Sequence, residues 1–451
     1  MINIKSDSRK IKPGDTFVAL KCVDNDGHKF VDKAIENGAS KVIVEHGNYS
    51  VETQIVDNTR DYITSFLKEK NKKELEKIKI IGITGTNGKT TSAFLLYQAL
   101  NLAHHKAAYI GTIGFYMDKK ITDLPNTTVD IVDLYELLLD CVDNNVEYVV
   151  MEVSSEGFYR RRVEGIKFNY AAFTNLTQDH LNIHGTMENY MKAKLQLFDS
   201  LDTDAKAFIN IDDPYYPNFM LEKNNNIGFG FKDCEYQVID YQMNNKGSVF
   251  SYKHNDIVKK VKSTLIGKYN IYNLILAISI LNEIGIDNIE SIISKLTPPP
   301  GRMDIVLYNN NSIIIDYAHT PDAVENIVKT IKQVTKGKVY VIFGCTGDRD
   351  KTKRPIMFNL VAKLSDYFII TNDDPHNEDE QSIVNDMIKG SKETNYEVCL
   401  DRKKAIEKGI KLLNIEDSLL ILGMGHQEYM IIKNEKIPYN DKKTVLSIIG
   451  K

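Results

Sequence analysis

The feature of this sequence that most constrains its fold is a glycine-rich turn between an apolar run and a helical pattern. The turn reads Gly85-Thr86-Asn87-Gly88-Lys89-Thr90-Thr91; the apolar run covers 78–84 and the helical pattern 92–103. Glycines let backbone N–H groups point inward, and the following helix offers its positive end to an anion. The turn therefore predicts a phosphate-binding loop, with Lys89 at the terminal phosphates and Thr90 on magnesium. Its glycine spacing, Gly82 to Gly88, is one residue longer than in the strict Walker motif.

Length and charge limit what surrounds this loop. A chain of 451 residues is too long for one core and predicts about two to four domains. A net charge of −4 argues against a general nucleic-acid binder. The five cysteines show no zinc-type spacing, which favours reduced thiols. No signal-peptide-like segment and no apolar run of ~18 residues occurs, so we expect a cytoplasmic protein that does not span a membrane.

The chain divides into three blocks, 1–75, 76–297 and 298–451. The sharpest break is Pro298-Pro299-Pro300-Gly301, because proline cannot extend a helix and glycine permits a change of direction. In the second and third blocks, β-like runs alternate with helical patterns, which predicts mostly parallel sheets covered by helices. Ligands of such sheets bind beyond the carboxyl ends of the strands. The β-like runs are 16–20, 42–45, 78–84, 148–153, 171–174, 207–211, 313–316, 339–343, 367–371 and 419–422.

Two polar runs follow strands of the second block. Met151 to Gly157 includes Glu152, a candidate magnesium ligand because magnesium prefers hard oxygen donors. A solvated strand end is an equally open interpretation of that run. Phe173 to Gly185 contains His180, and Lys194 follows at helical spacing. An isolated histidine is usually structural and an isolated lysine usually lies on the surface, but a shared block with the phosphate loop favours a functional cluster.

Further motifs occur in order along nearly the whole chain. They are Asp7-Ser8-Arg9, Asp26-Gly27-His28, Thr127-Thr128, the run from Thr177 to Gly185, Gly267 to Asn273, Pro300 to Asp304, Asp316 to Asp322, Gly347 to Lys351, Lys353-Arg354-Pro355, Asp373 to His376, and Gly423-Met424-Gly425-His426. With the phosphate loop, this series resembles the Mur ligases, ATP-dependent amide-forming enzymes of peptidoglycan precursor synthesis. Within the family, it is most similar to the enzymes that add the third stem-peptide residue.

The resemblance implies an α/β fold with three domains and assigns a role to each site residue. It implies a UDP-substrate-binding domain at 1–75, a central P-loop ATPase-like parallel sheet at 76–297 and a Rossmann-like amino-acid-binding domain at 298–451. The implied catalytic residues are Lys89, Lys194, His180 and Glu152. ATP would be bound by Gly85, Thr86, Asn87, Gly88, Lys89, Thr90, Thr91, Asn270, Arg302 and Asp316. The sugar-peptide substrate would be bound by Ser8, His28, Thr127, Thr128, Ser154, Arg160 and Arg162, and the amino acid by Arg349, Asp374, His376, Gly423 and Gln427. Magnesium would be held by Thr90, Glu152, His180 and Lys194, the last as a carbamate.

The chain departs from the family pattern at several positions. Glu156 stands where the family usually has His, and Arg160 stands where Gln is common. Family members that add meso-diaminopimelate carry Asp-Asn-Pro-Arg and Gly-x-Gly-His-Glu, whereas this chain has His376 in place of the Arg and Gln427 in place of the Glu. An imidazole does not replace a bidentate guanidinium toward a carboxylate. Lysine or another diamino acid therefore remains open.

The resemblance implies an ATP-dependent ligase that adds a diamino acid to the D-glutamyl carboxylate of UDP-N-acetylmuramoyl-L-alanyl-D-glutamate through an acyl phosphate. The expected cofactors are ATP and Mg2+, the expected partners are these substrates, and we expect a monomer. One alternative is a related ligase such as folylpolyglutamate synthetase, although the N-terminal block argues against it. A second alternative is a non-catalytic, nucleotide-dependent switch, for which Glu156 and Gln427 leave room.

Overall fold

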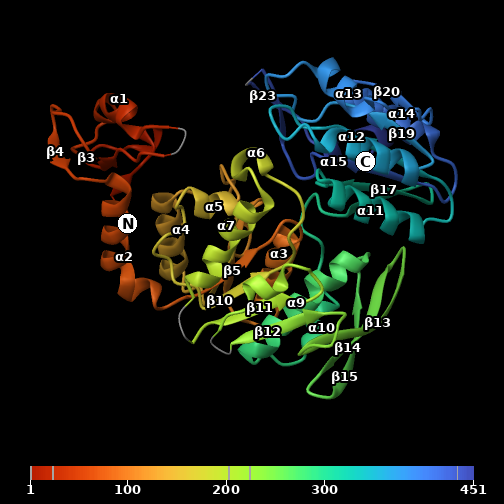
Figure 1. Ribbon diagram of the computed structural model, residues 1–451, viewed down its shortest axis with the longest axis horizontal. Helices are drawn as coiled ribbons and strands as arrows, with labels where there is room; N and C mark the ends of the chain where they lie inside the picture. The colour runs from red at the N-terminus through yellow and green to blue at the C-terminus, as the bar shows by residue number, and fades with distance from the viewer. Residues whose placement is uncertain (1–2, 23–24, 202–203, 223–224, 434) are drawn as a thin grey trace.

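The computed structural model describes residues 3–22, 25–201, 204–222, 225–433 and 435–451. Three α/β units lie in a row, with the N-terminal unit at one end and the C-terminal unit at the other (Figure 1). Each unit contains its own sheet, and the three sheets fall within the three blocks expected from the sequence. The expected α/β fold class is confirmed, while the exact domain boundaries stay predictions.

The N-terminal unit is a four-stranded, all-parallel sheet in the order β1-β2-β3-β4. Its strands are β1 (Ile4–Lys5), β2 (Thr16–Val18), β3 (Lys41–Val44) and β4 (Glu52–Ile55), and its helices are η1 (Ser8–Lys10), η2 (Gly27–Phe30), α1 (Val31–Glu36) and α2 (Thr59–Leu75). Helix α2 runs from this sheet to the central unit (Figure 1). The C-terminal part of α2, residues 68–75, is rich in charged residues and mostly exposed.

The central sheet has the order β15-β14-β13-β12-β11-β10-β5-β9-β6-β7-β8. From β13 to β6, neighbouring strands are parallel, and both edges are antiparallel. The strands are β5 (Lys79–Thr84), β6 (Ala107–Gly111), β7 (Gly114–Tyr116), β8 (Lys120–Thr122), β9 (Tyr148–Glu152), β10 (Tyr170–Phe173), β11 (Lys206–Asn210), β12 (Asn226–Gly230), β13 (Tyr236–Asn244), β14 (Gly247–His254) and β15 (Ile257–Ser263). No strand was predicted for the long β13–β15 meander, where β13 and β15 are largely exposed and β15 carries Lys259, Lys260 and Lys262.

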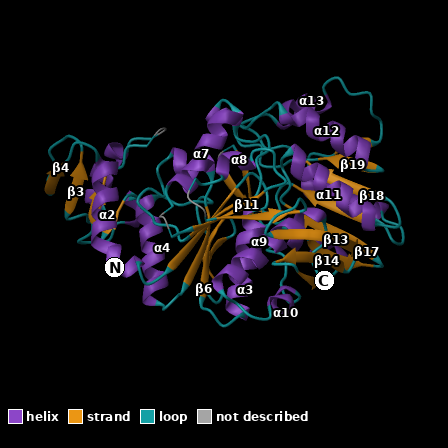
Figure 2. Cartoon of the chain, turned by 60° about the horizontal axis from the view of Figure 1, so that its bottom comes forward, coloured by secondary structure: helices purple, strands orange, loops and turns teal. Residues whose placement is uncertain are grey.

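Helices cover both faces of this sheet, which explains why its inner strands are apolar throughout. Helices α3 (Lys89–Leu102), α9 (Lys268–Ile284) and α10 (Ile289–Ile293) pack on one face. Helices α4 (Ile131–Asp143), α7 (Met187–Asp199) and α8 (Tyr216–Phe219) pack on the other, together with part of α2. Figure 2 shows the strands fanning out between these helices. The short helices α5 (Ser155–Tyr159) and α6 (Leu181–His184) follow strand ends.

The C-terminal unit has a six-stranded sheet in the order β16-β17-β21-β18-β19-β20, parallel except for β16. Its strands are β16 (Asp304–Tyr308), β17 (Asn311–Asp316), β18 (Val339–Phe343), β19 (Tyr367–Ile370), β20 (Tyr396–Val398) and β21 (Ser418–Leu422), with a separate hairpin of β22 (Tyr429–Ile432) and β23 (Glu435–Pro438). Helices α11 (Pro321–Val334), α12 (Lys353–Leu364) and α13 (Glu380–Ile388) cover one face, and α14 (Arg402–Leu412) and α15 (Asp441–Ile449) the other.

The predicted strands all exist, with ends shifted by one or two residues, as is usual at fraying ends. The predicted helix at 92–103 begins earlier, at Lys89, because the loop glycines lead straight into α3. Among the described helices, none combines the length and apolar character needed to cross a bilayer.

Candidate active site

The phosphate loop joins β5 to α3 and depends on a close approach that only glycine allows. Gly85 has φ 145°, and a Cβ there would lie 1.9 Å from Thr174 Oγ1. Gly88, at φ 86°, is the left-handed residue before the first turn of α3. The loop therefore lies directly against the end of β10, with Thr174 Oγ1 donating to Asn87 O at 2.7 Å. The N-terminus of α3 opens above the carboxyl ends of the parallel strands.

Two lysines meet at one carbonyl of this loop. Lys89 Nζ donates to Gly85 O at 3.0 Å, and Lys194 Nζ donates to the same oxygen at 2.7 Å. Lys194 is fully buried and lies 4.2 Å from the centre of the Tyr190 ring. Burial and the neighbouring Lys89 hold the pKa of Lys194 well below its usual range, and burial also lowers the pKa of Lys89. An amine with a lowered pKa is available uncharged, the form that reacts with carbon dioxide.

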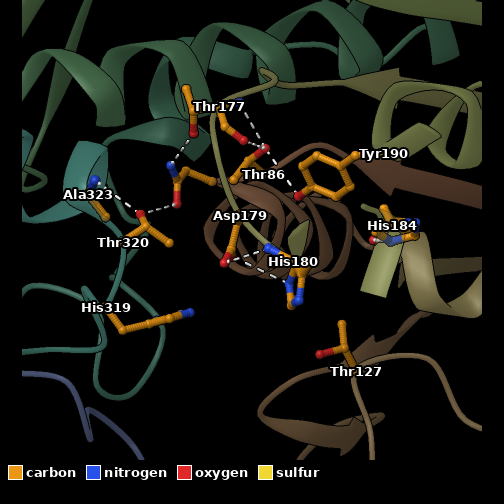
Figure 3. A network of polar contacts seen from close by, with 12 residues as sticks. Thr86, Thr127, Thr177, Asp179, His180, His184, Tyr190, His319, Thr320 and Ala323 are labelled. Carbon is orange, nitrogen blue, oxygen red and sulfur yellow. Dashed lines mark hydrogen bonds and ion pairs between the residues drawn. The ribbon is translucent and has the colours of Figure 1, made fainter. Parts of the chain in front are cut away.

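Figure 3 shows the second polar run beside Thr86 and Tyr190. Tyr190 donates its hydroxyl to Thr86 Oγ1 at 3.2 Å, and Thr86 donates to Thr177 O at 3.1 Å. The backbone N–H of His180 donates to Asp179 Oδ1 at 2.9 Å. The His180 side chain extends toward Thr127 in the same view. Burial lowers the pKa of His180, so its imidazole is neutral near pH 7.

Glu152 ends β9 with a fully buried carboxylate. Its Oε2 accepts from Thr90 Oγ1 at 2.8 Å, and its Oε1 accepts from Thr112 N–H at 2.8 Å. Thr90 and Glu152 thus present two hard oxygen donors side by side, a pair that fits Mg2+. Within the described ranges, no group of three or more His, Cys, Asp and Glu residues is placed to hold a metal. His180 and carbamylated Lys194 as further ligands stay predictions.

Two cavities meet at the phosphate loop and share Asn87, Gly88, Thr91 and Arg302. The smaller, of about 220 Å³, is lined by groups from the loop, from β9 and from the C-terminal unit. The larger, of about 420 Å³, is lined by Asn270 and Asp316 among others. The Asn270 amide is engaged internally, donating to Ile266 O at 2.8 Å and accepting from Asn273 at 3.0 Å. Asn270 therefore lines the cavity with one protein partner already at each polar atom of its amide.

Most predicted sugar-peptide residues lie at the smaller cavity. Thr127, Ser154 and Arg162 line it, and Arg162 donates to Thr128 O at 3.0 Å. Thr128 is buried behind them, where its hydroxyl donates to Glu152 O at 3.1 Å. Glu156, which departs from the family pattern, also lines the cavity. Arg160 Nε donates to the Glu156 carboxylate at 3.4 Å. This ion pair gives Arg160 a structural partner in addition to its predicted substrate role.

Ser8 and His28 lie apart from this cavity, in the N-terminal unit (Figure 1). Both ring nitrogens of His28 are engaged: Nδ1 lies 2.6 Å from Asp26 Oδ1, and Nε2 accepts from Glu45 N–H at 2.8 Å. His28 therefore has no free ring nitrogen for a ligand in this state, and its ring stacks on His46. Substrate binding by Ser8 and His28 stays a prediction.

The C-terminal unit closes over the phosphate loop. Arg302 donates to Thr90 Oγ1 at 3.4 Å and lies over the Tyr317 ring at 4.6 Å. Asn87 Nδ2 donates to Asp322 Oδ2 at 2.8 Å, which ties the loop to the first turn of α11. His319 points toward Asp179 (Figure 3), and burial lowers the pKa of His319 to about 4.

Asp316, in contrast, faces inward. It accepts from the N–H groups of Met303 and Ala318, at 2.7 and 2.8 Å. The carboxylate thereby fixes the segment that carries Arg302 and the loop that carries His319. Its predicted contact with ATP is untested, although it lines the larger cavity.

The predicted amino-acid residues form a loop cluster beside the β22–β23 hairpin. Gln427 Nε2 donates to Asp374 Oδ2 at 2.9 Å, and Ile431 N–H donates to Asp374 Oδ1 at 2.8 Å. His376 is held through its backbone, which bridges to Ile432. Gly423 packs so closely on the neighbouring Asp373 that a Cβ would lie 2.0 Å from its carboxylate. Arg349 is exposed nearby.

Sequence reasoning assigned no role to Tyr190, Tyr317, His319, Asp322 or Thr112. Tyr317, His319 and Asp322 lie inside a quoted motif, so that motif offered a signal. Tyr190 and Thr112 carry no sequence signal, because their contacts join residues 104 and 40 positions apart.

Three family models match the chain: "Mur ligase family, catalytic domain" over residues 2–96, "Mur ligase middle domain" over 83–281, and "Mur ligase, glutamate ligase domain" over 301–425. Among curated relatives, the UDP-N-acetylmuramoyl-L-alanyl-D-glutamate–2,6-diaminopimelate ligase of Clostridium botulinum is 38% identical, covering 99% of this chain and 94% of the relative. The ligase of the same name from Aquifex aeolicus is 36% identical, covering 99% and 93%.

Solved structures agree with this result. A UDP-N-acetylmuramoyl-L-alanyl-D-glutamate–2,6-diaminopimelate ligase is similar with a TM-score of 0.69 and 29% identity, covering 100% of this chain and 95% of that one. The MurF ligase of Thermotoga maritima in complex with ADP has a TM-score of 0.72 at 19% identity, covering 99% and 96%, a likeness of fold alone.

Proposed function

Because this chain belongs to the Mur ligase family, we propose that it uses ATP to join a diamino acid to the D-glutamyl carboxylate of UDP-N-acetylmuramoyl-L-alanyl-D-glutamate. The observation that carries the proposal is the composition of the smaller cavity. Phosphate-loop groups, the Thr90–Glu152 oxygen pair and the predicted sugar-peptide residues Thr127 and Arg162 all line it. An acid and a triphosphate can meet there.

The reaction needs activation because a carboxylate has no good leaving group. A carboxylate oxygen attacks the γ-phosphorus, the bond to ADP breaks, and an acyl phosphate forms. The amine of the diamino acid then attacks the acyl carbon, loses a proton and displaces phosphate. Lys89 offsets the phosphate charge at the helix N-terminus. Mg2+, which would be held by Thr90 and Glu152, would supply further charge neutralisation when bound.

The C-terminal unit would exclude water from this chemistry. Arg302, Tyr317 and His319 of the C-terminal unit line the cavity together with the phosphate loop. An acyl phosphate hydrolyses in water, so a closed cavity protects it. The neutral His319 can act as a hydrogen-bonding group at the reaction centre without adding a fixed charge. Carbamylation of Lys194 is part of the proposal, supported by its buried amine of lowered pKa.

The side chains of the loop cluster would determine which amino acid is added. The curated relatives are named for 2,6-diaminopimelate. This chain carries His376 and Gln427, so the proposal extends only to a diamino acid. The UDP end of the substrate would lie at Ser8 and His28 in the N-terminal unit. ATP, a nucleotide-linked sugar and free cysteines support a cytoplasmic location, and the proposal includes a monomer.

The test is a product panel read by mass spectrometry. The purified protein receives the UDP-linked dipeptide, ATP and Mg2+ with lysine, ornithine or one of the diaminopimelate isomers. We expect an amide product with one of these and one ADP for each amide. A Lys89→Met variant serves as the inactive control. Amide formation on a folate substrate instead would establish the related ligase, and ADP release without any amide would leave a nucleotide switch.

A further inference from the structure

Glu152 accepts a hydrogen bond on its core side from Tyr109, a residue that belongs to no sequence motif. The Tyr109 hydroxyl donates to Glu152 Oε1, inside the sheet core. Tyr109 is fully buried, with no exposed surface. A hydrogen bond to a charged group is stronger than a neutral one. The contact therefore constrains a carboxylate that the site uses.

The contact follows from strand register. In the parallel β6–β9 pair, Tyr109 is opposite Val150 and Ile110 is opposite Met151. Because side chains alternate along a strand, Tyr109, Gly111, Val150 and Glu152 point to the same face of the sheet. That face is the one covered by α3, whose first residues are Lys89 and Thr90.

Gly111 provides the space for the contact. A Cβ at residue 111 would lie 2.3 Å from Glu152 Oε1 and 2.5 Å from the Tyr109 hydroxyl. The absent side chain lets the carboxylate and the phenol meet above the strand. The Tyr109 ring is fixed in turn by Phe94 of α3, which it meets edge-on with the ring centres 5.5 Å apart. The glycine at position 111, the β6–β9 register and the packing against Phe94 together position the Tyr109 hydroxyl.

The two oxygens of Glu152 consequently have different surroundings. Oε1 accepts from Tyr109 and from the Thr112 N–H, on the core side. Oε2 accepts from Thr90 Oγ1, at the phosphate loop, and from Thr112 Oγ1 at 3.2 Å. The core-side bonds fix the direction in which Oε2 points.

We propose that Tyr109 is a positioning residue: its buried hydroxyl, with the Thr112 N–H, clamps Glu152 Oε1 so that Oε2 is directed at a divalent cation beside Thr90. The inference rests on the proposed ATP-dependent function for its choice of cation. Its test measures cation binding without ligation, so failure of one does not imply failure of the other. Groups that orient a metal ligand change metal affinity by roughly 10–100-fold when removed.

The experiment compares Tyr109→Phe with the parent protein. Mn2+ is titrated into each full-length protein saturated with a non-hydrolysable β,γ-methylene ATP analogue, and free Mn2+ is followed by electron paramagnetic resonance. We expect Tyr109→Phe to weaken Mn2+ binding about tenfold. The matched control is Tyr116→Phe, which removes a hydroxyl from the same aromatic cluster, 5.8 Å away between ring centres. It should leave the Mn2+ affinity within about twofold of the parent, since it does not contact Glu152.

A double-mutant cycle separates positioning from a general effect on folding. In a Glu152→Gln background, adding Tyr109→Phe should change the Mn2+ affinity by less than about twofold, because the clamped carboxylate is gone. In the ligation assay, excess Mg2+ should restore most of kcat to Tyr109→Phe, with a higher half-saturating Mg2+ concentration. An unchanged Mn2+ affinity in Tyr109→Phe would overturn the proposal. So would a tenfold loss that persists in the Glu152→Gln background.

Discussion

The reaction cavity and the amino-acid loop are built in different ways. At the cavity, functional side chains hold one another and the loop backbone: Lys194 reaches Gly85, 109 residues away, and Thr90 donates to Glu152. At the amino-acid loop, Gln427 and Asp374 are bonded to each other, whereas His376 is held through its backbone alone. His376 N–H donates to Ile431 O at 3.0 Å, and Lys433 N–H donates to His376 O at 2.7 Å. In the part of the chain that the structure describes, neither the His376 nor the Arg349 side chain makes a hydrogen bond or ion pair.

Under the proposed function, this difference separates the residues that carry out the reaction from those that select the amino acid. Changing a cavity side chain removes a partner from several others, so the phosphate-transfer machinery tolerates little substitution. Changing His376 or Arg349 leaves the loop backbone bonds in place. Under the proposed function, the cavity keeps the reaction while the His376 and Arg349 side chains select the amino acid. The predictions below challenge that division, from the largest expected effect to the smallest.

The strongest test is Lys194→Ala at the cavity. Loss of the buried amine removes a bond to Gly85 and any carbamate, so we expect kcat to fall by roughly 10²–10³-fold. Bicarbonate or chloride should restore part of the activity if a carbamate matters. The control is Lys192→Ala on the same helix, an exposed lysine paired with Glu188. Steady-state ADP release measures both, and full turnover in Lys194→Ala would remove this residue from the mechanism.

Asp373 is buried behind the loop, and the pH dependence of stability shows whether a buried charge is tolerated at this position. Burial raises the pKa of Asp373 from 3.8 to about 7, and its Oδ2 has no partner among the described residues. Below pH 3.8 both states are protonated. As pH rises, the unfolded state ionises first, so the free energy of unfolding should fall by about 1.4 kcal/mol per pH unit until pH 7. The total is about 4 kcal/mol.

Denaturant titrations at pH 4 to 7 measure this slope. Asparagine has the shape of aspartate but does not titrate. The free energy of unfolding of Asp373→Asn should therefore fall with pH less steeply than that of the parent, by about 1.4 kcal/mol per pH unit. Equal slopes in the two proteins would show that Asp373 is ionised in the fold at neutral pH.

The loop itself is tested by His376→Arg. A guanidinium can bind a second carboxylate in bidentate fashion, which an imidazole cannot. We expect kcat/KM for diaminopimelate relative to lysine to rise about tenfold, with the KM for ATP unchanged. A change in the KM for ATP instead would mean that the loop and the cavity are coupled, contrary to the division above.

The smallest effect is expected at the contact between the phosphate loop and α11 of the C-terminal unit. Asp322→Ala removes the acceptor for Asn87 and weakens closure of the C-terminal unit on the phosphate loop. We expect kcat to fall about three- to tenfold, since one hydrogen bond is worth about 1 kcal/mol. Asp287→Ala, at an exposed position after α9, is the control. Pre-steady-state measurements should assign the loss to the step that follows ATP binding.

Sequence reasoning located the parts of the site that depend on local geometry. Gly85, Gly88 and Lys89 follow from a strand, a turn and a helix in one short stretch. The role of Lys194 as a carbamylated magnesium ligand came from the family resemblance. Its contact with Gly85 was not predicted, because no local pattern joins residues that far apart. The role of Tyr109 could not be predicted for the same reason. In the sequence, a tyrosine in an apolar strand indicates a core residue, and only the β6–β9 register brings Tyr109 to Glu152.

Side-chain bonding could not be predicted either. His28 and Asn270 were assigned ligand contacts, yet their polar atoms already have protein partners. A residue type shows what a group can bind, whereas its neighbours determine whether that group is free. Such assignments depend on three-dimensional contacts that a single sequence does not contain.

The shared carbonyl of Gly85 has a consequence for nucleotide exchange. Lys89 Nζ donates to Gly85 O and to Thr86 O, so a triphosphate oxygen that takes one of these protons displaces an existing bond. The net gain is then smaller than the full strength of the new contact, which favours release as well as binding. Lys194 donates to the same Gly85 oxygen from α7 and so supports the turn independently of Lys89.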